Sequence, residues 1–403
     1  MGPLRRTPLL ALLLLGCVTS GAGRDGTAVL APPATAPPDA MADPIAGPVA
    51  QREQATTSPV ASAGASASTT AESAPPTLAQ QPVRVGPAQL LPLSAAQATI
   101  FAGSPQDPAT ELRLGVTKAR HGKHYLAGNE KTLQAFYPHI REIGGGYVGV
   151  GSDQAYLLIG WMRPEVAWFI DYDQDVVDVH TVYRVLFDHA ETPAELLALW
   201  TVDQKKHVAE LFLVAHPGDR GKHLRRLYLV NRGWIHRRLQ AVTKRLVAAK
   251  VPSYLNDQAT FDYVRSFLEA GRVRPLLANL LNETGFRGVA EAADKMGVAI
   301  NVLYLSNAEE YWKQYPQVFR DNVAALPFAD NAKILRTLLI WNVNEDYLYN
   351  VQPARNYLEW LAKPYTTNVY DIVYKRGQPD PAIINFFETD ESPEASPAAA
   401  RSK

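Results

Sequence analysis

Apolar and polar residues follow two different spacings along this chain, and together they predict alternating strands and helices. Short apolar runs at Tyr147–Val150, Val166–Ile170 and Ala299–Leu305 are typical of strands that are buried on both faces. Between Asp175 and Ala190, apolar residues instead recur every three or four positions, which indicates one buried face of a helix. Strands that alternate with helices favour an α/β fold with a Rossmann-like, doubly wound sheet and a helical insertion.

Further elements of both kinds follow along the chain. Strands are predicted at 273–277, 333–341 and 367–375, and helices at 261–270 and 288–296, each helix ended by a glycine. The interval from about 191 to 256 has helical spacing and contains Thr192 and Pro193, a common helix start. We interpret it as a helical insertion within one large domain that spans 83–387.

Both ends of the chain differ from this domain in composition. Residues 18–82 are rich in Ala, Pro, Ser, Thr and Gly and contain few large apolar side chains. Such a segment buries too little surface to offset the entropy of ordering, so we expect a disordered tether. The same reasoning predicts a disordered tail at 388–403.

The first 17 residues have the pattern of a lipoprotein signal peptide. Two arginines precede an apolar run at 8–15 that is too short to span a bilayer. The segment Leu14–Cys17 resembles the bacterial lipobox, whose cysteine is acylated, so a lipid bilayer is the expected partner of Cys17. This predicts a lipid-anchored protein of the cell envelope, and Val18, in place of a retention aspartate, favours the outer membrane. The alternatives are a plain secretory signal, or a cytoplasmic domain if the signal is misread.

Composition excludes several classes of chemistry. Cys17 is the single cysteine, so an intramolecular disulfide, a zinc–thiolate cluster and a catalytic thiol are excluded. The 40 basic and 40 acidic side chains balance, so no specific nucleic-acid partner is indicated. His121 and His124 form a close pair, but no acid lies near them in sequence, and no metal site is predicted.

A glycine turn after the first predicted strand indicates a nucleoside-type site. Gly149 and Gly151 let a ligand approach the backbone, and Asp171 follows about 20 residues later, where an acid can bind a ribose diol. Gln154 replaces the third glycine of the dinucleotide pattern, and Asp153 is expected to cap the following helix and repel a pyrophosphate. S-adenosylmethionine therefore fits better than NAD or FAD. The alternative is an ordinary turn whose glycines serve only the backbone.

Other polar residues also follow strands and are expected at the same edge of the sheet. Asp175 lies just after the second strand, among several acids. We expect these acids to bind a ribose or a cation; the alternative is that they only stabilise a helix N-terminus. Ser306, Asn307 and Glu309 follow the strand at 299–305. His180 is interpreted either as a donor to a ligand or as a core histidine bonded to a backbone carbonyl.

The segment 220–250 is helical in pattern and strongly basic. Seven of its basic residues are Arg225, Arg226, Arg232, Arg237, Arg238, Lys244 and Arg245. We consider two interpretations: a contact surface for an anionic partner of the envelope, such as lipid headgroups or acidic cell-wall polymer, and a solvated helix face balanced by acids elsewhere.

Several of these segments together resemble an uncharacterised bacterial family of Rossmann-like proteins, similar in layout to S-adenosylmethionine-dependent methyltransferases. The resemblance is carried by 144–154, by Asp171 with Asp175, by 180–187, by 306–311 and by 322–327. It implies a methyltransferase-like fold and an adenosine-type site. The chain departs from the family at 278–282, which lacks the acid and glycines of a GDFxG-like turn. It also has Tyr147 where methyltransferases usually have an acid.

Two functions from different classes follow. One is a methyltransferase-like enzyme in which Gly149, Gly151 and Asp171 hold the nucleoside and Ser306, Asn307 and Glu309 orient an unknown acceptor; no catalytic residue is assigned. The other is a non-catalytic, membrane-anchored lipoprotein whose sheet is a ligand-binding or scaffold domain. Because S-adenosylmethionine is made in the cytosol, export favours the second function, with no cofactor.

Overall fold

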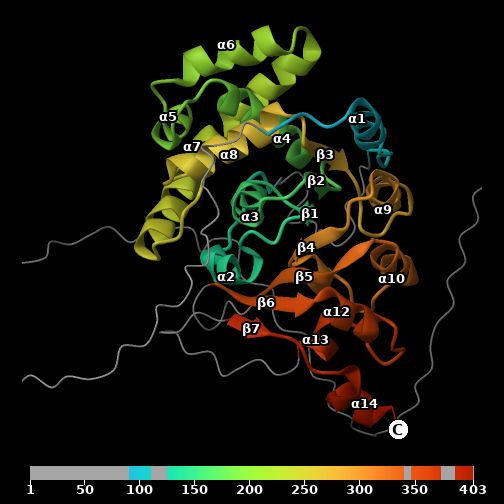
Figure 1. The fold of residues 1–403 in the computed structure, drawn as a ribbon. Coiled ribbons are helices and arrows are strands. Elements are labelled where there is room, and N and C mark those ends of the chain that lie inside the picture. Colours follow the sequence, from blue (N-terminus) through green and yellow to red (C-terminus); the bar gives the residue numbers. More distant parts are fainter. Residues whose placement is uncertain (1–89, 110–124, 340–345, 374–385, 403) are drawn as a thin grey trace, which may run out of the picture. The chain divides into compact units, whose positions relative to one another are not determined.

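Seven strands form one sheet at the centre of the domain (Figure 1). The structure, a computed structural model, describes residues 90–109, 125–339, 346–373 and 386–402. The strands are β1 (Gly146–Val150), β2 (Val166–Asp171), β3 (Val273–Leu277), β4 (Ile300–Ser306), β5 (Phe328–Leu339), β6 (Tyr347–Pro353) and β7 (Phe386–Glu388). The signal peptide with Cys17, the tether and His121 with His124 lie outside the described residues.

The strand order is β3-β2-β1-β4-β5-β6-β7. The first five strands are parallel to their neighbours, β6 is antiparallel to β5, and β7 is parallel to β6. The order 3-2-1-4-5 is that of a doubly wound sheet, whose direction of winding reverses between β1 and β4. The predicted Rossmann-like α/β fold is therefore confirmed.

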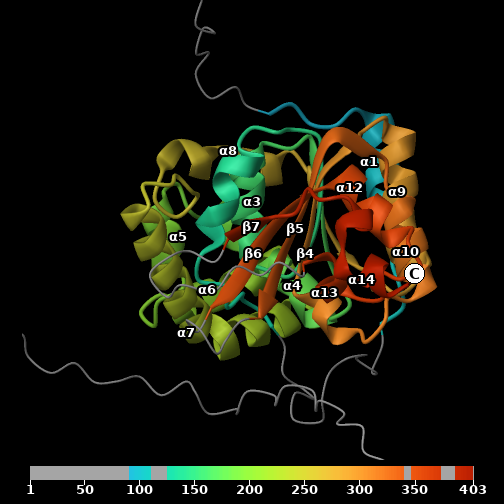
Figure 2. The same cartoon turned by 90° about the horizontal axis from the view of Figure 1, so that it is seen from below.

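Helices cover both faces of the sheet (Figures 1 and 2). On one face lie α2 (Tyr137–Ile140), α3 (Gln154–Met162), α4 (Gln174–Asp188), α5 (Pro193–Ala198), α6 (Lys205–Ala215), α7 (Asp219–Ala248) and α8 (Gln258–Glu269). On the other lie α1 (Ala95–Ala102), α9 (Thr284–Met296), α10 (Gln317–Ala324), α12 (Ala354–Leu361) and α13 (Val369–Ile372). Three 3-10 turns, η2 (Leu133–Phe136), η3 (Ala308–Tyr311) and η4 (Pro393–Ala395), and the short α14 (Pro397–Arg401) complete the described elements.

The alternation of side chains along each strand separates two hydrophobic cores. In β2, Ala167 and Phe169 belong to the core beneath α3 and α8, whereas Val166, Trp168 and Ile170 belong to the core beneath α9 and α10. All five of these side chains are buried. The continuous apolar runs that predicted the strands thus reflect burial on both faces.

The predicted helical insertion is present as α5, α6 and α7, between α4 and α8. Thr192 caps α5 as expected, because its hydroxyl accepts a hydrogen bond from the Glu195 amide. Among the described residues, no helix is both long and apolar enough to cross a membrane. The 30-residue α7 is long enough, but it is too rich in arginine and lysine.

Two predictions near the C-terminus differ from the structure. The strand expected at 367–375 is wrong for its described part: Asn368 and Asp371 form a capping box that starts α13 instead. The tail expected to be disordered contains part of β7, η4 and α14. It packs on α12, where the Trp360 indole donates to the Glu391 carbonyl and Lys363 pairs with Glu394.

Candidate functional site

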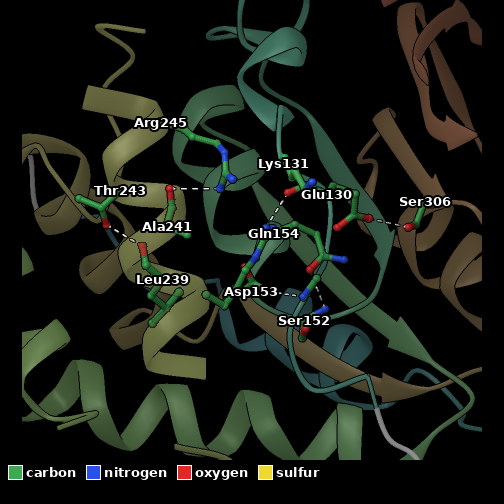
Figure 3. Close-up of polar contacts among 12 residues, drawn as sticks. Glu130, Lys131, Ser152, Asp153, Gln154, Leu239, Ala241, Thr243, Arg245 and Ser306 are labelled. Atoms are coloured by element: carbon green, nitrogen blue, oxygen red, sulfur yellow. Dashed lines mark hydrogen bonds and ion pairs between the residues drawn. The ribbon is translucent and has the colours of Figure 1, made fainter. Parts of the chain in front are cut away.

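The candidate site is the edge of the sheet where β1, β2 and β4 end. In a doubly wound sheet, ligands bind beyond the carboxyl ends of the strands, at the point where the winding reverses. Here that point lies between β1, followed by Gly151 to Asp153, and β4, followed by Asn307. The segment 125–132, which precedes η2, also reaches this edge and contacts both strand ends (Figure 3).

Side chains of the protein itself fill the space beside both glycines of the turn. A Cβ atom placed on Gly149 would lie 2.1 Å from the hydroxyl oxygen of Tyr147, two positions earlier on the same face of β1. A Cβ atom on Gly151 would lie 2.2 Å from the side-chain nitrogen Nε2 of Gln154, and Gly151 has a positive φ of 95°. The glycines are needed, but the atoms that need the space belong to this chain.

Asp153 does not cap α3 as predicted. Its side chain makes no capping hydrogen bond. One oxygen instead accepts from the Gly128 amide, and the other lies 3.1 Å from Nε of Arg238 on α7. Both charged side chains are buried, and an unpaired carboxylate beside a buried arginine would be costly, so the ion pair takes precedence over the cap.

Arg238 also binds the segment 125–132. Its Nη1 donates to the Glu130 carbonyl oxygen at 2.6 Å. Burial lowers the pKa of Arg238, but the nearby charges of Asp153 and Glu130 more than offset this, and the net shift is upward. Arg238 is therefore a charged link between the insertion, the β1 turn and this segment. It is not part of a solvated basic face.

Ser306 is bonded to the same segment. Its hydroxyl donates to Oε1 of Glu130 at 2.8 Å, and the Tyr304 hydroxyl donates to the same oxygen at 2.8 Å. Figure 3 shows Glu130 beside Ser306, close to the turn formed by Ser152, Asp153 and Gln154. Glu130 is buried, with 2% of its surface exposed. The β1/β4 crevice is thus occupied by the side chain of Glu130 and the backbone of Gly128.

Four buried polar atoms in this region have no hydrogen-bond partner among the described residues. They are Oε2 of Glu130, Nη2 of Arg238, Oγ of Ser152 and Oη of Tyr147. Burial, followed by the charge of Glu130, raises the pKa of Tyr147, so its phenol stays neutral and able to donate. The filled crevice therefore contains unsatisfied donors and an acceptor, but not the glycine-lined surface of a nucleoside site.

At the end of β2, Asp171 is less enclosed. It is partly exposed, and it accepts backbone hydrogen bonds from Asp173, Tyr172 and Gly151. Burial of the carboxyl raises its pKa to about 7, although these hydrogen bonds oppose the shift. The acid predicted to bind a ribose thus does lie beside the glycine turn.

His180 is a core histidine bonded to a backbone carbonyl, one of the two interpretations of the sequence. Its Nε2 lies 3.0 Å from the Gly151 carbonyl oxygen, so that nitrogen must carry the proton and donate. Its Nδ1 then accepts from the Tyr156 hydroxyl. Burial lowers the pKa of His180 to about 4, so it is neutral at pH 7 and holds the turn in place.

Asp175 faces α7 from the first turn of α4. Together with Asp178 and His223, it offers ligand atoms that all lie within 4.8 Å of one another. However, Nη1 of Arg220 lies 2.7 Å from the Asp178 oxygen that also faces His223, and Gln174 donates to the other Asp178 oxygen. A protein cation is thus already bound to one of the three groups that a metal ion would need.

Glu309 is part of a separate, fully buried network. It lies 2.9 Å from Nε of Arg336 on β5 and accepts from the hydroxyls of Tyr315 and Tyr357. Neither Glu309 nor Arg336 is accessible enough to meet an acceptor substrate. Asn307 precedes η3 without a capping side-chain bond. The group Ser306, Asn307 and Glu309 is therefore not brought together as an acceptor site.

Sequence reasoning missed Glu130 altogether and assigned Arg238 to the exposed basic face. A signal for Arg238 was present, because it lies three residues after Ile235 and four before Val242, within the apolar stripe of α7. No comparable signal marks Glu130, whose partners lie 174 and 176 positions away.

A family model matches the larger part of this domain. Residues 125–389 match a domain of unknown function, DUF7790, and the match covers more than half of the chain. The chain therefore belongs to this family. A search of curated proteins finds no match. The matched region begins at Tyr125, so the segment with Gly128 and Glu130 is included in the family domain.

Proposed function

We propose that this protein is a membrane-anchored lipoprotein whose Rossmann-like domain serves as a non-catalytic scaffold, in which the site of a methyl donor has been replaced by protein contacts. One observation carries the proposal. The crevice between β1 and β4 is filled by Glu130 and by the Asp153–Arg238 pair. These groups lie where a ligand of a doubly wound sheet would bind.

S-adenosylmethionine does not fit the residues on this side of the crevice. Its sulfonium and ammonium groups need accessible acceptors, whereas the Asp153 carboxylate is already paired with a guanidinium and one oxygen of Glu130 is bonded to Tyr304 and Ser306. The space over Gly149 belongs to the Tyr147 ring. We therefore derive no methyl-transfer step.

A second candidate function is retained because of Asp171. Asp171 belongs to a partly exposed strand end, and an acid at this position beside Gly151 is the arrangement that a ribose diol requires. If segment 125–132 moved away, the β1/β4 crevice beside Asp171 would be open to an adenosine-type ligand. Methyl transfer by an S-adenosylmethionine-dependent enzyme is the function that such a site would serve.

Ligand-induced stabilisation separates these two functions. The whole chain with Cys17→Ser is heated alone and with S-adenosylmethionine, S-adenosylhomocysteine or NAD. A ligand at a hundred times its Kd stabilises a protein by about 2.7 kcal/mol, which raises the Tm by a few degrees. We expect no shift with any of the three. A shift with S-adenosylhomocysteine that Asp171→Ala abolishes would establish the second function instead.

The anchor is tested independently of the domain. We expect the wild-type chain, expressed in a bacterium that acylates lipoproteins, to incorporate radiolabelled palmitate and to fractionate with membranes. Cys17→Ser removes the only thiol in the sequence and should abolish both. Equal labelling of the two proteins would rule out acylation at Cys17.

A further inference from the structure

The outer face of α7 carries a stripe of basic and apolar side chains that are exposed. Arg226, Val230, Arg237 and Lys244 follow one another at intervals of four, seven and seven residues, so they lie on one side of the helix. All four are exposed, and 72% of the surface of Val230 is accessible. In Figures 1 and 2, α5, α6 and α7 lie at the outside of their face of the sheet.

Positive charge is concentrated in this part of a chain that is neutral as a whole. Residues 191–250 contain twelve basic and five acidic side chains, against 40 of each in the full sequence. Four of the basic residues form ion pairs: Arg238 with Asp153, Arg220 with Asp178, Lys222 with Asp219 and Arg225 with Glu210. Within the described part of the chain, no carboxylate lies within 4 Å of Arg226, Arg237 or Lys244.

A hollow of about 550 Å³ between α6 and α7 extends this basic surface. Four cationic side chains line it, Lys205 and Lys206 from α6 and Arg225 and Arg232 from α7. Its one acid, Glu210, is 3.8 Å from Arg225 and neutralises only part of this charge. Leu229 lines the hollow and also borders the stripe. Phosphate groups are the anions that such a cluster of lysines and arginines suits.

The apolar members of the stripe distinguish a lipid surface from other polyanions. Leu229, Val230 and Val247 are 38%, 72% and 57% exposed, and they lie among the cations on the same side of α7. Nucleic acid and acidic polysaccharide interact favourably with the charges but not with exposed aliphatic side chains. The boundary between headgroups and acyl chains interacts favourably with both.

We propose that the outer face of α7 and the α6–α7 hollow dock the domain on a membrane surface rich in anionic phospholipid headgroups. The inference deepens the proposed function and rests on it, because an acyl anchor would place the domain beside such a surface. The stripe would lie along the headgroups with Val230 and Val247 inserted between them, and the hollow would take individual lipid phosphates.

Vesicle binding tests the surface without the anchor. The whole chain with Cys17→Ser, which cannot be acylated, is sedimented with vesicles of phosphatidylcholine alone or with one quarter phosphatidylglycerol. We expect binding only to the anionic vesicles, weakening as salt is raised. The further changes Arg226→Gln, Arg237→Gln and Lys244→Gln should together weaken it by roughly 100-fold, because each basic residue at an anionic surface contributes about tenfold or less.

A matched control separates the surface from net charge. Lys295→Gln, Lys313→Gln and Arg355→Gln also remove three exposed cations, from the part of the domain that carries α9 and α12. Binding should stay within about twofold, and both triple variants should keep the parent Tm, because surface substitutions change stability little. Equal loss in the two triple variants would overturn the proposal, as would equal binding to neutral vesicles.

The apolar contribution has its own test. Val230→Ser with Val247→Ser should weaken binding to anionic vesicles by roughly tenfold and leave binding to duplex DNA unchanged. Tighter binding to duplex DNA than to vesicles at equal phosphate concentration would overturn the proposal in favour of a nucleic-acid surface. Failure of palmitate labelling in the wild type would refute the anchor alone, since these measurements use the unacylated chain.

Discussion

The two sides of the glycine turn differ in what satisfies their acids. On the β1/β4 side, Asp153 is buried and paired with Arg238, an arginine brought from α7, 85 positions away. On the β1/β2 side, Asp171 is partly exposed and, within the described part of the chain, is bonded to backbone amides of its own and the adjoining turn. The first acid is committed to an ion pair, whereas the second, at a partly exposed strand end, has no cationic partner within 4 Å among the described residues.

The difference shows that the residues of a nucleoside-type motif can serve contacts within the protein instead of ligand binding. Gly149, Gly151 and Asp153 all have the spacing of a ligand turn, yet their space and charge are used by Tyr147, Gln154 and Arg238. What the spacing specifies is a tight turn and a close approach of other atoms. Whether those atoms belong to a ligand or to the protein is decided by residues far away in sequence.

The largest expected effect comes from breaking the β1/β4 side. Arg238→Ala leaves Asp153 buried without its counter-ion and removes a donor from the Glu130 carbonyl. Loss of one partner of a buried ion pair costs about 3–5 kcal/mol, so the free energy of unfolding should fall by that amount. Denaturant titration followed by circular dichroism measures it.

Arg237 provides the matched control, since it precedes Arg238 on the same helix but is exposed. Arg237→Ala should change the free energy of unfolding by no more than about 0.5 kcal/mol. Similar losses in both variants would mean that the Asp153–Arg238 pair does not hold the crevice closed.

A smaller effect is expected from Gly149→Ala. The added methyl group would overlap the Tyr147 ring, which is fully buried and has little room to move. Overpacking of this kind costs about 1–3 kcal/mol. A double-mutant cycle with Tyr147→Leu should recover most of that loss as coupling between the two sites. If there is no coupling, or if Gly149→Ala is stable but alters ligand binding, then Gly149 serves a ligand and not the packing of Tyr147.

Local features of the fold were predictable because they depend on neighbouring residues. Val273–Leu277 was located correctly, and so was the end of α9 at Gly297, a residue with φ of 69° that ends the helix in a left-handed conformation. The error at 367–375 has a local cause as well, because the Asn368–Asp371 capping box outweighed the strand-like composition that follows.

The candidate site was less predictable, because its decisive contacts are long-range. The sequence places Ser306 at a strand end and Asp153 at a turn, and the structure confirms both positions. Their partners, Glu130 and Arg238, come from a loop before the first strand and from the insertion. Pattern reasoning treats such segments as surroundings, so it assigned Ser306 to an acceptor substrate and Asp153 to a helix cap beside the ligand.

The smallest expected effect concerns the open side and depends on pH. Burial raises the folded-state pKa of Asp171 to about 7, above the value of about 3.9 in an unfolded chain. Ionisation therefore favours the unfolded state, and this penalty grows between about pH 4 and pH 7 and is constant above pH 7. Asp171→Asn removes it, so the variant should gain stability relative to the wild type across that range, by about 1–2 kcal/mol once solvent screening of the partly exposed group is allowed for.

His180, whose pKa of about 4 also affects stability at acidic pH, is present in both proteins and cancels in the comparison. Tm values of the two proteins from pH 4 to pH 8 measure the difference. A constant difference would show that Asp171 has an ordinary pKa, and the contrast between a committed and an accessible acid would then rest on geometry alone.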